Sequence, residues 1–165
     1  MLDRGFNNKI IFSIASHDEY ESAATSLSRH QGPELQLAFK DKVERYTRKK
    51  DRDVILARIE DKIVGYCLVI YQLTPPDSLP PEVFQRLISY GCITGLGVNP
   101  EWRENGIGAS LVREGLEWAR HHGLPGIWLR TRVMAEWYKK HLQFERVGSM
   151  IVKKTVKKAV LAKAL

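Results

Sequence analysis

The sequence predicts a single mixed α/β domain over residues 1–165, built on a mainly antiparallel sheet of about six or seven strands flanked by about four helices. The chain has the usual length of one domain and is long enough to bury a core. Its content of 44% hydrophobic and 27% charged residues is typical of globular proteins. Short segments rich in β-branched residues alternate with segments of helical periodicity, without an internal repeat.

The first half of the chain is predicted to contain one strand, two helices and a hairpin of two further strands. The Gln-Gly-Pro sequence at 31–33 separates the two helices, because Gly and Pro are breakers and Pro suits the first turn of a new helix. Residues 60–62 are short enough to join two antiparallel strands. These elements are a strand at 10–14, helices at 18–29 and 33–49, and strands at 54–59 and 63–73.

The second half is predicted to alternate strands and helices after a proline-rich loop at 74–81. Gly95 and Gly97 lie within one predicted strand, where glycine is typical of a bulge or of a close backbone approach. The helix after this strand leads to a parallel strand by a crossover that should be right-handed. The elements are a helix at 82–89, a strand at 92–98, a helix at 107–122 closed by Gly123, a strand at 127–133, a helix at 135–142, a strand at 144–156, and residues 158–165 as either a final strand or a tail.

Charge and cysteine content narrow the classes of function. The formal net charge of +7 should attract anions such as a phosphorylated cofactor. We interpret the lysine pairs at 153–154 and 157–158 as residues that blunt an exposed strand edge, rather than as a nucleic-acid site. Cys67 and Cys92 lack the spacing of a zinc site or a redox pair, so we expect buried free thiols and no metal.

No segment is expected to cross a membrane. The longest apolar run, at 63–73, has about half of the roughly 20 residues that a spanning helix requires. The first 14 residues lack the hydrophobic region and the cleavage site of a signal peptide. We therefore expect a cytoplasmic protein.

A glycine-rich turn precedes the helix at 107–122. Its sequence is Arg103-Glu104-Asn105-Gly106-Ile107-Gly108. Because glycine lacks a Cβ atom, such a turn can direct several N–H groups into one concavity at a helix N-terminus, where unpaired donors and the helix dipole favour phosphate. The spacing is that of neither a P-loop nor a dinucleotide-binding fingerprint. The turn therefore predicts a phosphate site, to which Arg103 adds a positive charge.

Residues 92–147 resemble the acyl-CoA-binding half of the GNAT superfamily of N-acyltransferases, through the pattern Leu96-x-Val98-x-Pro100-x-x-Arg103-x-x-Gly106-x-Gly108. The resemblance implies a GNAT-like fold with one parallel strand pair splayed for CoA, and acetyl-CoA as the acyl donor. It implies that the backbone of Leu96, Gly97 and Val98 pairs with the pantetheine arm, and that the Leu96 amide is the oxyanion donor. The implied pyrophosphate-binding residues are Arg103, Glu104, Asn105, Gly106, Ile107, Gly108 and Ala109.

The family motif that follows the next strand is matched in part. Ala135 and Phe144 agree with it, whereas Arg132 replaces an asparagine and Gln143 replaces a glycine. These departures leave the alignment of the intervening helix open.

Two alignments of that helix compete for the position of the family's tyrosine, which often protonates the leaving thiolate. Without a gap, Tyr138 takes an aromatic core position and Lys139 replaces the tyrosine. With one inserted residue, Trp137 and Tyr138 form the family's Phe-Tyr pair. The resemblance makes Tyr138 the candidate general acid, and both alignments stay open.

No general base is assigned. An amine of pKa near 10 is mostly charged at neutral pH, yet residues 90–98 contain no carboxylate to deprotonate it. Glu82 and Glu101 fit solvated surface acids better, and His30 fits a loop residue.

The resemblance implies an N-acetyltransferase that moves an acetyl group from acetyl-CoA to a primary amine of a small molecule or protein, and it is compatible with a homodimer. The departures from the family motif favour an alternative, a non-catalytic CoA-binding sensor or interaction module. A basic domain that binds nucleic acid or protein is a third and weaker alternative.

Overall fold

The computed structural model describes residues 9–28, 40–43, 45, 49–152 and 156–165. Within them, one seven-stranded sheet has the order β1-β2-β3-β4-β5-β7-β6. All neighbouring strands are antiparallel except β4 and β5, which confirms the predicted mixed sheet. The strands are β1 (Ile10–Ile14), β2 (Arg52–Ile59), β3 (Lys62–Ile70), β4 (Gly91–Val98), β5 (Gly126–Thr131), β6 (Glu145–Val152) and β7 (Val156–Ala164).

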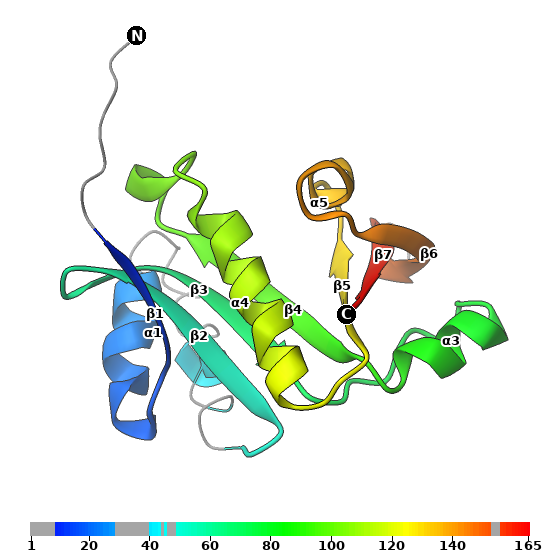
Figure 1. The fold of residues 1–165 in the computed structure, drawn as a ribbon, viewed down its shortest axis with the longest axis horizontal. Coiled ribbons are helices and arrows are strands. Elements are labelled where there is room, and N and C mark those ends of the chain that lie inside the picture. Colours follow the sequence, from blue (N-terminus) through cyan, green and yellow to red (C-terminus); the bar gives the residue numbers. More distant parts are fainter. Residues whose placement is uncertain (1–8, 29–39, 44, 46–48, 153–155) are drawn as a thin grey trace, which may run out of the picture.

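Helices lie on both faces of this sheet (Figure 1). None of the described helices has the length and apolar character that crossing a membrane requires. Most of the predicted helix at 33–49 lies outside the described residues. Within that range, residues 40–43 are described and are helical. The helices are α1 (Tyr20–Ser28), α3 (Pro81–Leu87), α4 (Ile107–His121) and α5 (Ala135–Leu142), with short 3-10 turns η1 (His17–Glu19) and η2 (Pro100–Trp102).

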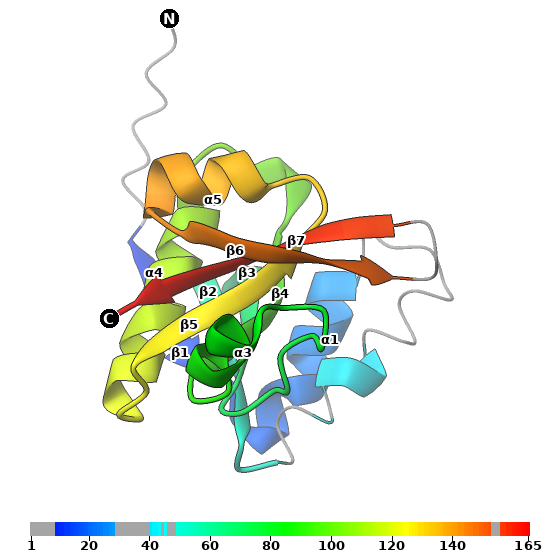
Figure 2. The same cartoon turned by 90° about the vertical axis from the view of Figure 1, so that its right-hand side faces the viewer.

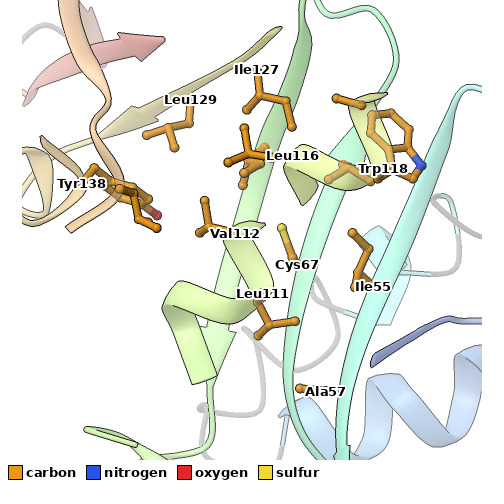
Figure 3. Packing of buried hydrophobic residues seen from close by; sticks show 14 of the residues in the cluster. Ile55, Ala57, Cys67, Leu111, Val112, Leu116, Trp118, Ile127, Leu129 and Tyr138 are labelled. Carbon is orange, nitrogen blue, oxygen red and sulfur yellow. The ribbon is translucent and has the colours of Figure 1, made fainter. Parts of the chain in front are cut away.

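The side chains of β2 point alternately to the two faces of the sheet and pack in a different core cluster on each face. Ile55 and Ala57 pack in the cluster that contains α4 and α5, shown in Figure 3. Val54 and Leu56 point the other way and pack in a second cluster with α1. Successive strand residues face opposite sides of a sheet, so one strand supplies both clusters.

A third cluster covers the α1 side of the sheet beyond β4. It joins Leu87 of α3 to Cys92 of β4 and Trp128 of β5, and Figure 2 shows α3 in front of β5. Cys92 is a buried free thiol there, and Cys67 is another in the α4 cluster, which confirms the prediction for both cysteines.

The parallel contact between β4 and β5 is short. The strands pair at three positions, Gly91 with Ile127, Cys92 with Trp128 and Ile93 with Leu129. β4 then continues for five residues, Thr94 to Val98, without pairing to β5. The pairing with β3 shifts at the same place, where Thr94 is an extra residue between Ile93 and Gly95. The sheet therefore opens from Thr94 onward, and this opening agrees with the predicted splay.

The C-terminal strands differ from the prediction. Residues 144–156 were expected as one strand, but β6 ends at Val152, and residues 156–164 form the separate strand β7. β7 lies between β5 and β6 and pairs with both. Lys158 therefore lies on an interior strand, and its interpretation as a residue of an exposed edge is wrong.

Two other strands, β3 and β5, end before their predicted last residues. β3 stops at Ile70 rather than at 73, and Tyr71 instead donates its hydroxyl to the carbonyl of His122 at 2.9 Å. β5 stops at Thr131 rather than at 133, because the Thr131 hydroxyl accepts the N–H of Met134 and turns the chain into α5.

Two glycines in the core provide a stability prediction. An added Cβ at Gly126 would lie 2.6 Å from the carbonyl oxygen of Lys163 and 2.6 Å from Cδ2 of Tyr90. We expect Gly126→Ala to lower the free energy of unfolding by about 1–3 kcal/mol, because an overpacked site strains its neighbours. Urea denaturation of the purified variant measures this change.

Gly115→Ala is the matched control. Its added Cβ would meet Ile93 at 3.4 Å and Cys67 at 3.6 Å, which is ordinary contact. Alanine is also a better helix former than glycine, so this variant should equal or exceed the wild type by up to about 1 kcal/mol. Equal stability of the two variants would contradict the packing at Gly126.

Candidate functional site

The predicted phosphate-binding turn joins the open end of β4 to α4. Asn99 is the N-cap of η2, and its side chain accepts the N–H of Glu101. Glu104 and Gly106 both have left-handed backbones, with φ of 65° and 75°. Gly106 is the N-cap of α4, and a glycine there avoids the steric cost of a side chain in that conformation. The turn therefore reverses the chain within a few residues and opens directly into the helix.

Side chains of the turn hold its backbone in place. Asn105 donates through Nδ2 to the carbonyls of Trp102 at 3.2 Å and Arg103 at 3.0 Å. Arg103 donates through Nε to the carbonyl of Val98 at 3.2 Å, which ties the turn to the end of β4. Neither side chain has a partner among the N–H groups of α4. Those N–H groups remain directed along the helix axis.

The first turn of α4 provides the donors that a phosphate requires. The N–H of Ser110 bonds to the carbonyl of Gly106 at 3.0 Å, so the N–H groups of Ile107, Gly108 and Ala109 precede the first bond of the helix. α4 has 15 residues, long enough for its dipole to add about half a positive charge at this end. The arrangement suits an anion.

A groove of about 420 Å³ lies over this helix N-terminus, between α4 and α5. Cationic Arg103 and Arg113 line it together with His141, opposed by the carboxylate of Glu104. Aromatic and apolar groups form its remaining wall, and the Trp137 ring lies 5.7 Å from that of His141. A phosphorylated ligand with an apolar arm fits this combination. The lining residues are Val98, Trp102, Arg103, Glu104, Gly106, Ile107, Gly108, Ala109, Arg113, Met134, Trp137 and His141.

The unpaired part of β4 borders the groove. Leu96, Gly97 and Val98 are half-buried, and their strand has no β5 partner beside it. The Tyr66 ring closes the other side of Gly97, where an added Cβ would lie 2.7 Å from Cζ. The Tyr66 ring thus covers one face of the sheet at Gly97, and β3 occupies one edge of β4, so the edge toward β5 is the one open to an extended ligand.

Tyr138 lies on the inner side of α5 and is 7% exposed. Its ring packs against Phe144 with centroids 5.6 Å apart, and its hydroxyl points toward Val112 of α4 (Figure 3). Burial raises the pKa of Tyr138 to about 12. The phenol is therefore protonated throughout the neutral range and can donate a hydrogen bond.

Lys139 faces the solvent instead. Its Nζ pairs with Glu136 Oε1 at 3.1 Å, on the exposed side of α5. Of the two residues that compete for the family's tyrosine position, Tyr138 faces the interior. The acids considered as bases lie elsewhere, since Glu82 is exposed in α3 and Glu101 lines a different pocket with Trp102 and Asn99. His30 lies outside the described residues.

A model of the acetyltransferase (GNAT) family matches residues 15–144. The chain belongs to the GNAT acetyltransferase family. The match begins well before the glycine turn, so it also includes the first half of the chain, which lies outside the resemblance at residues 92–147. A search of curated proteins finds no match.

Solved GNAT structures share this fold. An aminoglycoside 6'-acetyltransferase type Ii is 22% identical, with a TM-score of 0.73 over 93% of this chain and 96% of that one. An aminoglycoside N-acetyltransferase in complex with CoA is 13% identical, with a TM-score of 0.71 over 92% and 97%. The ribosomal-protein-S18-alanine N-acetyltransferase from Escherichia coli is 13% identical, with a TM-score of 0.67 over 94% of each chain. At these identities the likeness concerns the fold.

Several residues of the groove in this GNAT acetyltransferase were missed by sequence reasoning. Arg113 follows Ala109 by four residues, so helical spacing places both on one side of α4. Trp137 and His141 have the same spacing on α5. This helical spacing is the signal in the sequence that indicates both pairs, whereas Tyr138 lies on the inner side of α5.

Proposed function

We propose that this GNAT acetyltransferase transfers an acetyl group from acetyl-CoA to a primary amine, with CoA bound in the groove at the start of α4. The left-handed turn at Gly106 carries the proposal, because it begins α4 in the same groove that Arg103 and Arg113 line, next to the open end of β4. Three unpaired amides, two guanidinium groups and an apolar wall match a pyrophosphate joined to a long arm.

The residues that would hold CoA fall into two groups. The N–H groups of Asn105 to Ala109, assisted by Arg103, would bind the pyrophosphate. The backbone of Leu96, Gly97 and Val98 would pair with the pantetheine arm, because the groups of β4 that face β5 have no strand beside them. Pairing of an extended ligand with a free strand edge gives affinity through main-chain hydrogen bonds.

The reaction needs a donor to the carbonyl oxygen and a donor to the sulfur. When bound, acetyl-CoA supplies the acetyl group as a thioester. The amine nitrogen bonds to the carbonyl carbon while the carbon–sulfur bond breaks. The sulfur takes a proton from its donor, and the amine loses one proton, which restores the donor. The Leu96 N–H is the candidate donor to the carbonyl oxygen, and Tyr138 is the candidate donor to the sulfur.

Calorimetric titration with acetyl-CoA, followed by free-thiol release with a panel of amines, tests the proposal. Binding together with amine-dependent thiol release is the expected result. Binding without release on any amine would instead support the non-catalytic sensor, for which the core position of Tyr138 is the favouring observation. Absence of acetyl-CoA binding would contradict both functions.

A further inference from the structure

The strand β1 forms one edge of the sheet and lacks the features that usually protect an edge. Among the described strands, β1 pairs with β2 alone (Figure 1). Native edge strands commonly carry a charge, a proline or a bulge, because unpaired backbone groups accept a further strand. The sequence of β1, Ile-Ile-Phe-Ser-Ile, has neither charge nor proline, and its pairing with β2 is regular. Ile11 and Ile14 are 50% and 53% exposed. This edge can therefore accept another strand.

The backbone groups of alternate residues face the open side of β1. The N–H of Ala15 donates to the carbonyl of Val54 at 2.8 Å. Antiparallel strands alternate between hydrogen-bonded and non-hydrogen-bonded pairs, so Ser13 is the next residue that bonds to β2. The residues whose N–H and carbonyl groups face away from β2 are therefore Ile10, Phe12 and Ile14.

A pocket of about 300 Å³ adjoins this open side, between β1 and the C-terminal half of α4. Phe12 and Ile14 line it from β1, and Trp118 lines it from α4. The Trp118 indole is held in place, because its Nε1 donates to Asp53 Oδ2 at 2.7 Å and its ring lies 4.5 Å from that of His122. The aromatic wall of the pocket is therefore formed before any ligand binds.

Carboxylates of α4 line the same pocket. Glu114 is half-buried, and no ion-pair partner for it is present among the described residues. Glu117 pairs with Arg120 at the surface. His121 and His122 complete this side and are neutral in the formal net charge of +7. A carboxylate beside an indole ring suits a cationic side chain, which both groups attract. The pocket thus has the opposite charge preference to the chain as a whole.

We propose that β1 binds an extended, basic segment of a partner protein as an added strand, with a lysine or arginine side chain of that segment in the pocket beside Glu114. The aliphatic stem of this side chain would cover Phe12 and Trp118 while its charged end reaches the carboxylate. Main-chain bonds to β1 would give affinity, and the pocket would give specificity. The inference does not depend on the proposed function, because the pocket and the groove assigned to CoA lie at opposite ends of α4.

A second copy of this chain fits the same edge less well. The five residues of β1 span about 17 Å, which is too short to bury by itself the roughly 1,200 Å² or more of a stable interface. The net charge of +7 makes two copies repel each other. The side chains of β1 are uncharged, so β1 of a second copy would bring no cation to Glu114.

A heptapeptide of alternating lysine and valine, blocked at both ends, tests the proposal. Alternation places the lysines on the pocket side of an added strand and the valines on the side of Ile11. Calorimetric titration should show saturable binding. A peptide with glutamate in place of lysine, and a peptide of the same composition with its lysines grouped together, should each bind about tenfold or more weakly.

N-methylation of the peptide tests the main-chain pairing. In an added strand, alternate N–H groups face β1 and the others face solvent. Two versions of the lysine–valine peptide are therefore compared, one methylated at two lysine amides and one at two valine amides. One version should lose about tenfold or more in affinity, while the other keeps it. Equal affinity of the two versions would show that no strand is added to β1.

Variants of the protein connect the binding to this surface. Glu114→Gln should weaken binding of the lysine–valine peptide by about tenfold, and Ile14→Lys should weaken it at least as much, because like charges on neighbouring strands repel. Glu82→Gln and Ile88→Lys make the same changes at exposed residues of the α3 region and should leave the affinity unaltered. All four variants should keep the Kd of acetyl-CoA.

The outcomes decide between the possible occupants of the edge. Absence of peptide binding, equal affinity for the lysine and glutamate peptides, or equal effects of Glu114→Gln and Glu82→Gln would overturn the proposal. Analytical ultracentrifugation gives a further readout, for which a monomer is expected. A dimer that Ile14→Lys dissociates and Ile88→Lys does not would assign the edge to a second copy and overturn the proposal of a basic partner segment.

Discussion

Gly106→Val is expected to abolish measurable acetyl-CoA binding and leave a folded protein. Gly106 has φ of 75°, a conformation that costs a residue with a side chain about 1–2 kcal/mol, and more when it is β-branched. An added Cβ meets no protein atom within 4 Å, so the fold can absorb the change. The turn would relax, however, and its N–H groups would no longer converge.

The size of the effect follows from the bonds that are lost. A hydrogen bond to a charged group contributes about 1.5–3 kcal/mol, so losing two of them weakens binding by about a hundredfold or more. Calorimetric titration with acetyl-CoA measures the Kd, and circular dichroism checks the fold.

Gly123→Val is the matched control. Gly123 ends α4 with φ of 66°, and an added Cβ there also meets nothing within 4 Å. The backbone strain is thus the same at both ends of one helix, while the groove lies at one end alone. Binding lost equally in both variants, or retained in Gly106→Val, would contradict the pyrophosphate-binding turn.

Tyr138→Phe is expected to lower kcat by about a hundredfold with an unchanged Kd for acetyl-CoA, because general acids contribute about 10²–10⁴-fold. The change removes one oxygen and keeps the ring packed against Phe144, so the fold should not suffer. Steady-state thiol release gives kcat, and calorimetry gives the Kd.

The control is Tyr90→Phe, at a buried tyrosine in the α3 cluster, which should retain full activity. The pH dependence adds a second readout. The pKa of Tyr138 is raised to about 12, and the donor must be protonated. The contribution of Tyr138 to kcat is therefore constant below about pH 10 and is lost only as the pH rises through 12. An unchanged kcat in Tyr138→Phe would remove Tyr138 from the mechanism, and a fall in kcat between about pH 8 and 10 that disappears in Tyr138→Phe would contradict its raised pKa.

Local patterns predicted the strand, turn and helix around the candidate site well, because one continuous segment builds them. The strand, turn and helix from Gly91 to His121 follow from alternation, from the Asn99-Pro100 breaker and from a glycine that a left-handed backbone requires. The family match agrees with the same segment. The reason is physical, since a helix N-terminus binds an anion through atoms adjacent in sequence.

Features that depend on distant segments were not predictable in this way. The position of Lys42 against Thr94 depends on a contact across 52 residues, and no local pattern signals it. The orientation of Tyr138 depends on how α5 packs against α4, and the two alignments of that helix left this orientation open. The lysines at 157–158 were interpreted as residues of an exposed edge, but β7 pairs with both β5 and β6. The sequence of a strand does not show which strands pair with it.

The interior position of β7 has a consequence for the order of assembly during synthesis. Strands β1 to β4 pair with neighbours that follow one another along the chain, and α4 covers them, so this half of the sheet can form as soon as it leaves the ribosome. In the described structure, β6 pairs with β7 alone, and it must wait for a strand translated after it. Contacts of long sequence separation close slowly. Pulsed hydrogen exchange during refolding should therefore protect the amides of β2 and β3 before those of β5 and β6.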